Sequence, residues 1–128
     1  MKRIEFSGIV VSGRGCGKKF LEMKWVKRQI TEKLGFMPYP GTLNIKLTGE
    51  STKREQLLKK APSAKICPAE GYRSGLLVKA FIGIVECAII LPEVPRYPKT
   101  LLEIIAPVNL RKTLQLEDGF EVTVAVNV

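Results

Sequence analysis

Short strand-like segments recur along this chain of 128 residues, and they constrain its fold more than any other feature. They are predicted at residues 3–12, 42–47, 75–82, 84–91, 101–105 and 120–126, from alternating apolar residues or from short apolar runs. An open sheet of such strands would leave two edges able to pair with other chains, and closure into a barrel removes both edges. We therefore expect a mostly β protein, folded as a closed six-stranded barrel with two or three short helices.

The predicted helices are short and lie between the strands. Apolar residues three and four positions apart predict a helix over residues 21–34, with Gly35 as its C-terminal cap. A capping-box pattern predicts a second helix over residues 52–61. A proline at a first helical position predicts a third over residues 107–114. Residues 61–75 have the composition of a loop.

The composition limits the chemistry that is available to the chain. There is no histidine, so the commonest general base and the commonest metal ligand are missing. The three cysteines form no C-x-x-C pair, which argues against a disulfide framework or a zinc knuckle. The most apolar window, residues 76–91, is shorter than the ~20 residues that a membrane-spanning helix needs. We expect no membrane contact and a cytoplasmic protein.

The net charge of +9 leaves two interpretations open. A basic surface attracts polyanions such as nucleotides, nucleic acids or anionic membranes. The same charge also serves simply to keep a protein in solution.

A glycine-rich segment, residues 13–19, follows the first predicted strand and ends in two lysines. Without Cβ atoms, such a segment lets backbone N–H groups approach an anion closely, and the lysines add positive charge at the same place. A phosphate-bearing ligand would fit it. A glycine-rich hairpin turn explains the pattern equally well.

Three further positions carry polar groups where a ligand could bind. Thr42 and Asn44 lie two residues apart, so their oxygens share one strand face and suit Mg²⁺ if phosphates supply the negative charge. A solvent-facing polar stripe is the alternative, and Lys46 shares that face. Glu103 interrupts an apolar strand and is either an exposed rim residue, a hydrogen-bond acceptor for a ligand, or a base for a hydroxyl. Arg111 either holds an anion at a helix start or pairs with an acidic residue of the following turn, Glu117 or Asp118.

Four of these segments together resemble the archaeal CTP-dependent riboflavin kinases: Ser12–Lys18, Gly35–Asn44, Leu102–Arg111 and Leu116–Gly119. Their order and the gaps between them also fit that family. The resemblance implies a cradle-loop (RIFT-related) barrel, which agrees with the closed barrel expected from the strand pattern. Longer members carry an N-terminal winged-helix domain. We expect residues 1–128 to form a single barrel domain without it.

The resemblance also implies an activity. The γ-phosphate of CTP is transferred to the 5′-hydroxyl of riboflavin, giving FMN and CDP, with Mg²⁺ as the metal. The implied partners are these two small molecules, and we expect a monomer. The family pattern implies nucleotide binding by Gly13, Arg14, Gly15, Cys16, Gly17, Lys18, Val108, Asn109, Leu110 and Arg111, metal binding by Thr42 and Asn44, and flavin contact by Glu103.

The resemblance leaves the chemical role of Glu103 open, and the chain departs from the family pattern at Pro95. A catalytic role of Glu103 in orienting the ribityl hydroxyl or accepting its proton is our hypothesis. Pro95 occupies the position where family members typically carry a threonine that contacts the flavin, and it has neither a hydroxyl nor an N–H group.

Two other functions remain as alternatives. One is a small basic barrel that binds nucleic acid, because residues 110–126 also resemble AbrB-type swapped-hairpin regulators. The other is a barrel that binds flavin without turnover.

Overall fold

The computed structural model describes residues 2–13, 16–49, 60–67, 69, 71, 74–93 and 96–128. Its strands are β1 (Arg3–Val11), β2 (Leu43–Leu47), β3 (Ala64–Ile66), β4 (Gly75–Ile82), β5 (Val85–Pro92), β6 (Leu101–Ile105) and β7 (Glu121–Asn127). The described helices are α1 (Cys16–Glu22), α2 (Lys24–Leu34) and α4 (Leu110–Thr113).

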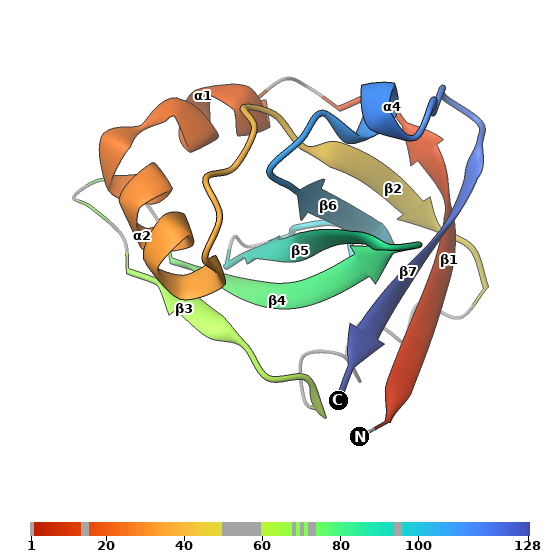
Figure 1. Ribbon diagram of the computed structural model, residues 1–128, viewed down its shortest axis with the longest axis horizontal. Helices are drawn as coiled ribbons and strands as arrows, with labels where there is room; N and C mark the ends of the chain where they lie inside the picture. Colours follow the sequence, from red (N-terminus) through yellow and green to blue (C-terminus); the bar gives the residue numbers. More distant parts are fainter. Residues whose placement is uncertain are drawn as a thin grey trace.

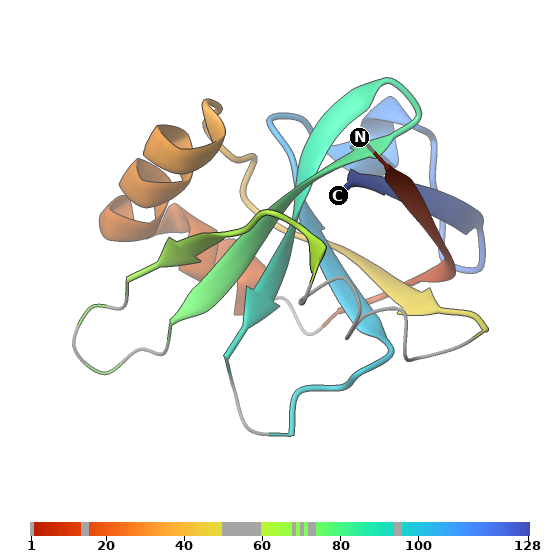
Figure 2. The same ribbon diagram turned by 90° about the horizontal axis from the view of Figure 1, so that it is seen from below.

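Six strands close into an antiparallel barrel, as predicted. Their order around the barrel is β4-β5-β6-β2-β1-β7, and β7 returns to β4 through the pair Phe81 and Ala125. The short strand β3 pairs with the first residues of β4, outside this ring. Figures 1 and 2 show the strongly twisted strands wrapping around a common interior.

Strand β5 shows why part of the sequence reads as an apolar run and not as an alternation. Cys87, Ile89 and Leu91 point into the barrel, whereas Ala88 and Ile90 pack outside it in the cluster that α1 and α2 cover. A strand buried on both faces needs apolar residues at successive positions. Burial also raises the pKa of Cys87 to about 12, so this thiol stays protonated at neutral pH.

The helix expected over residues 21–34 begins earlier and is broken. Two helices, α1 and α2, meet at Met23, whose extended backbone (φ −67°, ψ 132°) interrupts the helical hydrogen bonding. Helix α2 buries Val26, Ile30 and Leu34 and ends at Gly35, whose φ of +79° is the left-handed cap conformation that glycine adopts readily. The cap was predicted correctly, but the start was not.

This earlier start changes the interpretation of the glycine-rich segment. From Cys16 onward the segment is helical and forms the first turn of α1. The alternative of a hairpin turn is therefore wrong, and the segment is not a loop over its whole length. The start of α1 consists mainly of glycine and lysine residues, and only Phe20 and Leu21 contribute to an apolar face. The apolar spacing that identifies a helix is therefore too short to be recognised there.

Two other expectations need correction. The expected loop over residues 61–75 contains β3, in which Ile66 is buried. The expected helix over residues 107–114 begins only at Leu110, because the Asn109 side chain accepts a hydrogen bond from the Lys112 N–H and caps the helix there. The helix expected over residues 52–61 falls almost entirely outside the described residues.

The arrangement separates the two ends of the barrel. The end of β1, the start of β2, the start of α1 and helix α4 gather at one end, whereas both chain termini lie at the other (Figure 1). The termini are joined there, since Lys2 and Val128 exchange two backbone hydrogen bonds of 3.1 and 2.7 Å. In the described part of the chain, no helix has the length and apolar character to cross a membrane.

Candidate functional site

Two adjoining cavities lie at the end of the barrel away from the termini. The first, which we call the glycine cavity, has a volume of about 320 Å³ and is lined by Ser12, Gly13, Gly17, Lys18, Gly41, Thr42, Asn44 and Arg111. The second, the helix cavity, has a volume of about 170 Å³ and is lined by Tyr39, Pro40, Gly41, Thr42, Leu43, Ile104, Ala106, Val108, Asn109, Leu110 and Arg111. Gly41, Thr42 and Arg111 line both, so one elongated ligand can occupy the two cavities together.

Two glycines allow the glycine-rich segment to lie directly on strand β2. A Cβ atom on Gly13 would stand 2.3 Å from Asn44 Nδ2, and one on Gly17 would stand 2.9 Å from Thr42 Cγ2. Both distances are below van der Waals contact, so a larger residue at either position would require the segment or the facing side chain to shift. The polar face of Thr42 and Asn44 is therefore covered by this segment, and it is not a solvent-facing stripe.

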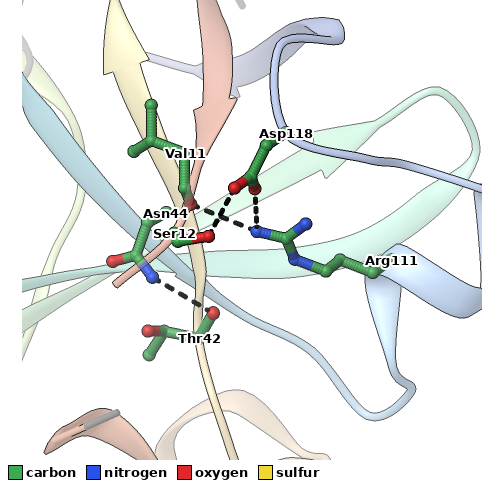
Figure 3. A network of polar contacts seen from close by, with 6 residues as sticks. All are labelled: Val11, Ser12, Thr42, Asn44, Arg111 and Asp118. Atoms are coloured by element: carbon green, nitrogen blue, oxygen red, sulfur yellow. Dashed lines mark hydrogen bonds and ion pairs between the residues drawn. The ribbon is translucent and has the colours of Figure 1, made fainter. Parts of the chain in front are cut away.

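Asn44 is a buried polar residue that lines the glycine cavity. Its side chain is 9% exposed, and its Nδ2 donates a long hydrogen bond of 3.5 Å to the Thr42 carbonyl (Figure 3). Its Oδ1 has no hydrogen-bond partner in the described part of the chain. Because a buried amide oxygen without a partner costs free energy, this atom indicates a ligand or ion in the cavity.

Glu103 lies beside Asn44 on the neighbouring strand β6, as its direct cross-strand partner. Its carboxylate accepts hydrogen bonds from the Thr42 hydroxyl, at 3.4 Å, and from the Tyr97 hydroxyl. It is partly buried, so the structure favours a hydrogen-bond acceptor over an exposed rim residue. Glu103 thus joins Thr42 to the connection between β5 and β6.

Two segments that line the helix cavity, the stretch before β2 and the residues at the start of α4, are connected by hydrogen bonds. The Tyr39 N–H donates to the Ala106 carbonyl at 2.7 Å, and Asn109 Nδ2 donates to the Tyr39 hydroxyl at 3.4 Å. Val108 is partly exposed at the cavity, whereas Leu110 turns its side chain into the core. Leu110 therefore offers a ligand mainly its backbone.

Arg111 pairs with Asp118 and still lines both cavities. Its Nη2 donates to Asp118 Oδ1 at 2.7 Å and to the Val11 carbonyl at 3.2 Å, and the other Asp118 oxygen accepts from the Ser12 hydroxyl (Figure 3). The Ser12 hydrogen bond, followed by the Arg111 guanidinium, holds the pKa of Asp118 below its usual value.

Most residues that the sequence assigned to a site come together at these cavities. Gly13, Gly17, Lys18, Thr42, Asn44 and Arg111 line the glycine cavity, and Val108, Asn109, Leu110 and Arg111 line the helix cavity. Cys16 is described only as the first residue of α1, and Arg14, Gly15 and Pro95 lie outside the described residues. Lys46 is exposed and lines neither cavity.

Several residues at the site were not assigned to it from the sequence. Ser12 and Gly41 lie within the segments that carry the family resemblance, Ser12–Lys18 and Gly35–Asn44, and that was the available signal. Tyr39 and Tyr97 read as loop anchors beside prolines, although an aromatic residue in such a loop is also suited to contact a flat ligand. Asp118 appeared only as a candidate partner of Arg111, and its bond to Ser12 was not foreseen.

The fold and the cavities together define a class: a small closed β-barrel with a glycine-lined, partly cationic cavity suited to a phosphate-bearing ligand. A family model named CTP-dep_RFKase, described as the domain of unknown function DUF120, matches residues 10–126. The chain therefore belongs to the archaeal CTP-dependent riboflavin kinase family.

Curated relatives agree with this assignment. A riboflavin kinase of Methanococcoides burtonii is 40% identical, over 97% of this chain and 57% of its own length. Riboflavin kinases of Ignicoccus hospitalis and Saccharolobus solfataricus are 42% and 37% identical, each over 98% of this chain and over 72% and 75% of their own lengths. The chain thus spans little more than half of the Methanococcoides relative.

Proposed function

We propose that this chain transfers the γ-phosphate of CTP to the 5′-hydroxyl of riboflavin, giving FMN and CDP. The observation that carries the proposal is the packing of Gly13 and Gly17 onto Thr42 and Asn44 around one cavity, together with the unpartnered Asn44 Oδ1 among the described residues. The family and the names of the relatives supply the identity of the substrates. Phosphoryl transfer depends mainly on alignment and charge neutralisation, and a cavity of this kind provides both.

The two cavities divide the binding of the nucleotide between them. The backbone N–H groups of the glycine-rich segment and the Lys18 ammonium would bind phosphate oxygens in the glycine cavity. The start of α4, from Val108 to Arg111, would bind the rest of the nucleotide in the helix cavity. Arg111 stands between the two and can contact both parts.

The residues of the glycine cavity fit Mg²⁺. The Thr42 hydroxyl and Asn44 Oδ1 are neutral oxygen ligands, and Mg²⁺ uses few protein ligands when phosphates and waters complete its coordination. Within the described residues, no group of three acidic, cysteine or histidine side chains could hold a metal by itself, so phosphates would have to supply the negative charge. When bound, Mg²⁺ neutralises the phosphate charge that develops during transfer.

Glu103 would receive the ribityl end of riboflavin. Its carboxylate is oriented by Thr42 and Tyr97, so it can accept a hydrogen bond from the 5′-hydroxyl next to the phosphates. Because Glu103 is the cross-strand partner of Asn44, an alcohol bound at Glu103 would lie next to phosphates bound at Asn44. This is the proposed catalytic role of Glu103, as an orienting group and proton acceptor.

Replacing Glu103 with glutamine tests this role. Glutamine keeps the shape but loses the charge and the basicity, and we expect kcat to fall about 100-fold, the low end for loss of a general base. The KM for CTP should change little, since Glu103 lines neither nucleotide cavity. Steady-state kinetics with each substrate varied in turn measures both constants.

The matched control is Glu86→Gln, which makes the same change at an exposed position of β5 and should leave kcat unaltered. An unchanged kcat in Glu103→Gln would remove the catalytic role and leave at most flavin binding.

The proposed function itself is tested by incubating the protein with riboflavin, Mg²⁺ and either CTP or ATP, followed by separation of the flavins. We expect FMN and an equal amount of CDP with CTP, and little product with ATP. A barrel that only binds flavin, or a nucleic-acid-binding regulator, gives no FMN with either nucleotide. That result would overturn the proposal, and binding of duplex DNA that falls steeply with salt would then favour the regulator.

A further inference from the structure

We propose that Asp118 is a positioning residue for nucleotide binding, which acts by fixing the guanidinium of Arg111 at the junction of the two cavities. This inference rests on the proposed function. It concerns a residue that lines neither cavity and would affect the nucleotide only through Arg111.

The backbone holds Asp118 in place without help from its side chain. The Gly119 N–H donates to the Val10 carbonyl at 2.8 Å, and the Val10 N–H donates to the Phe120 carbonyl at 2.9 Å. The turn that carries Asp118 is therefore attached to the end of β1 by main-chain bonds on its C-terminal side. Loss of the carboxylate should leave this turn in place.

Arg111 has donors to spare for a ligand. A guanidinium carries five N–H groups, and the contacts to Asp118 and to the Val11 carbonyl both use Nη2. The N–H groups on Nε and Nη1 have no partner in the described part of the chain. Because the guanidinium is planar and rigid, fixing one nitrogen also fixes the direction of the other two.

The same carboxylate reaches the glycine-rich segment. Its second oxygen accepts from the hydroxyl of Ser12, which directly precedes Gly13 and lines the glycine cavity (Figure 3). Asp118 therefore connects three segments that would contact the nucleotide or support those that do: the end of β1, helix α4, and the turn before β7.

If charge alone mattered, removing the Asp118 carboxylate would strengthen nucleotide binding, whereas the proposal predicts that it weakens binding. The direction of the change in affinity therefore tests the proposal. A carboxylate near a phosphate site repels the ligand, so removing it should tighten nucleotide binding if charge is all that matters. An exposed ion pair, moreover, contributes little by itself, and both partners here are partly exposed, 38% for Arg111 and 52% for Asp118. Weaker binding after removal of the negative charge would therefore come from loss of the positions that Asp118 fixes, chiefly that of Arg111 and also that of Ser12.

The experiment compares Asp118→Asn with Glu117→Gln. Both changes remove one negative charge from the same turn, but Glu117 is exposed, and within the described residues its side chain makes no hydrogen bond or ion pair with the site. We expect CDP to bind Asp118→Asn about 10-fold more weakly, the size of one charge-assisted hydrogen bond. Glu117→Gln should bind CDP as tightly as the unaltered protein, or more tightly. Titration calorimetry at fixed ionic strength measures all three affinities.

A double-mutant cycle shows whether Asp118 acts through Arg111. In the background of Arg111→Ala, the change Asp118→Asn should cause no loss of CDP affinity beyond the small loss expected from Ser12→Ala. In turnover, the KM for CTP should rise in Asp118→Asn while the KM for riboflavin stays constant, which general destabilisation would not produce. Ser12→Ala provides a second variant with Asp118 intact, and we expect a smaller loss of affinity from it.

Equal or tighter CDP binding by Asp118→Asn would overturn the proposal, and so would a loss of undiminished size in the Arg111→Ala background. Failure of the proposed function looks different, since the unaltered protein would then neither bind CDP nor form FMN.

Discussion

Replacing Asn44 with leucine should abolish FMN formation while the protein stays as stable as before, or becomes more stable. Leucine has a similar branched shape but cannot bind a metal or donate a hydrogen bond. A buried amide oxygen without a partner costs about 1–3 kcal/mol, and leucine removes that cost. Activity should fall about 100-fold or more, because the oxygen proposed to bind Mg²⁺ is lost.

Two measurements check this prediction, the rate of FMN formation and the thermal melting temperature. Asn127→Leu is the matched control, since this asparagine is exposed at the end of β7, and it should retain full activity. Activity within about tenfold of the unaltered protein in Asn44→Leu would contradict a role of this side chain in the reaction. A large fall in melting temperature would show instead that the amide is needed for folding.

Replacing Gly13 with alanine should lower both the rate of FMN formation and the stability of the protein. The new methyl group would stand 2.3 Å from Asn44 Nδ2, so the glycine-rich segment or the Asn44 side chain must shift. Either shift displaces a group that would position the nucleotide or its metal, and a displacement of about 1 Å in a positioning element can lower the rate about 100-fold. The overpacking should also cost about 1–3 kcal/mol of stability.

Gly83→Ala separates the two effects of this change. Gly83 lies in the β4–β5 turn with a φ of +61°, and a Cβ atom there would have no atom within 4 Å, so alanine introduces backbone strain without a clash. We expect this variant to lose stability but not activity. If Gly13→Ala lost stability and kept its kcat, close packing of the segment on β2 would not be needed for the reaction.

The parts of the fold that were predictable are those in which burial or backbone conformation directly determines the residue type. Leu43, Ile45 and Leu47 alternate with polar residues because β2 has one face in the core. Gly35 marks the end of α2 because its backbone conformation favours glycine. In both cases the constraint acts on a residue and its immediate neighbours.

The parts that were not predictable depend on contacts far along the chain. Helix α1 was missed because Gly17, within its first turn, serves the packing against β2 and not the helix itself. Strand β3 is only three residues long and is stabilised by pairing with β4. Asp118 forms a hydrogen bond with Ser12, which lies 106 positions away in the sequence.

The candidate site residues were chosen from short motifs, and most of those that the structure describes lie around the two cavities. Thr42 and Asn44 were selected because two residues of separation put side chains on one face of a strand, and they do lie in one cavity. Their contact with Gly13 and Gly17 could not be read from the spacing, since it depends on how the end of β1 turns into α1.

The paired ends of the chain at Lys2 and Val128 have a practical consequence. Whatever is fused to either terminus, whether an affinity tag, a fluorescent reporter or an additional domain, starts at the end of the barrel opposite to the two cavities (Figure 1). Tethering the protein to a solid support through either end should therefore leave both cavities accessible to solution.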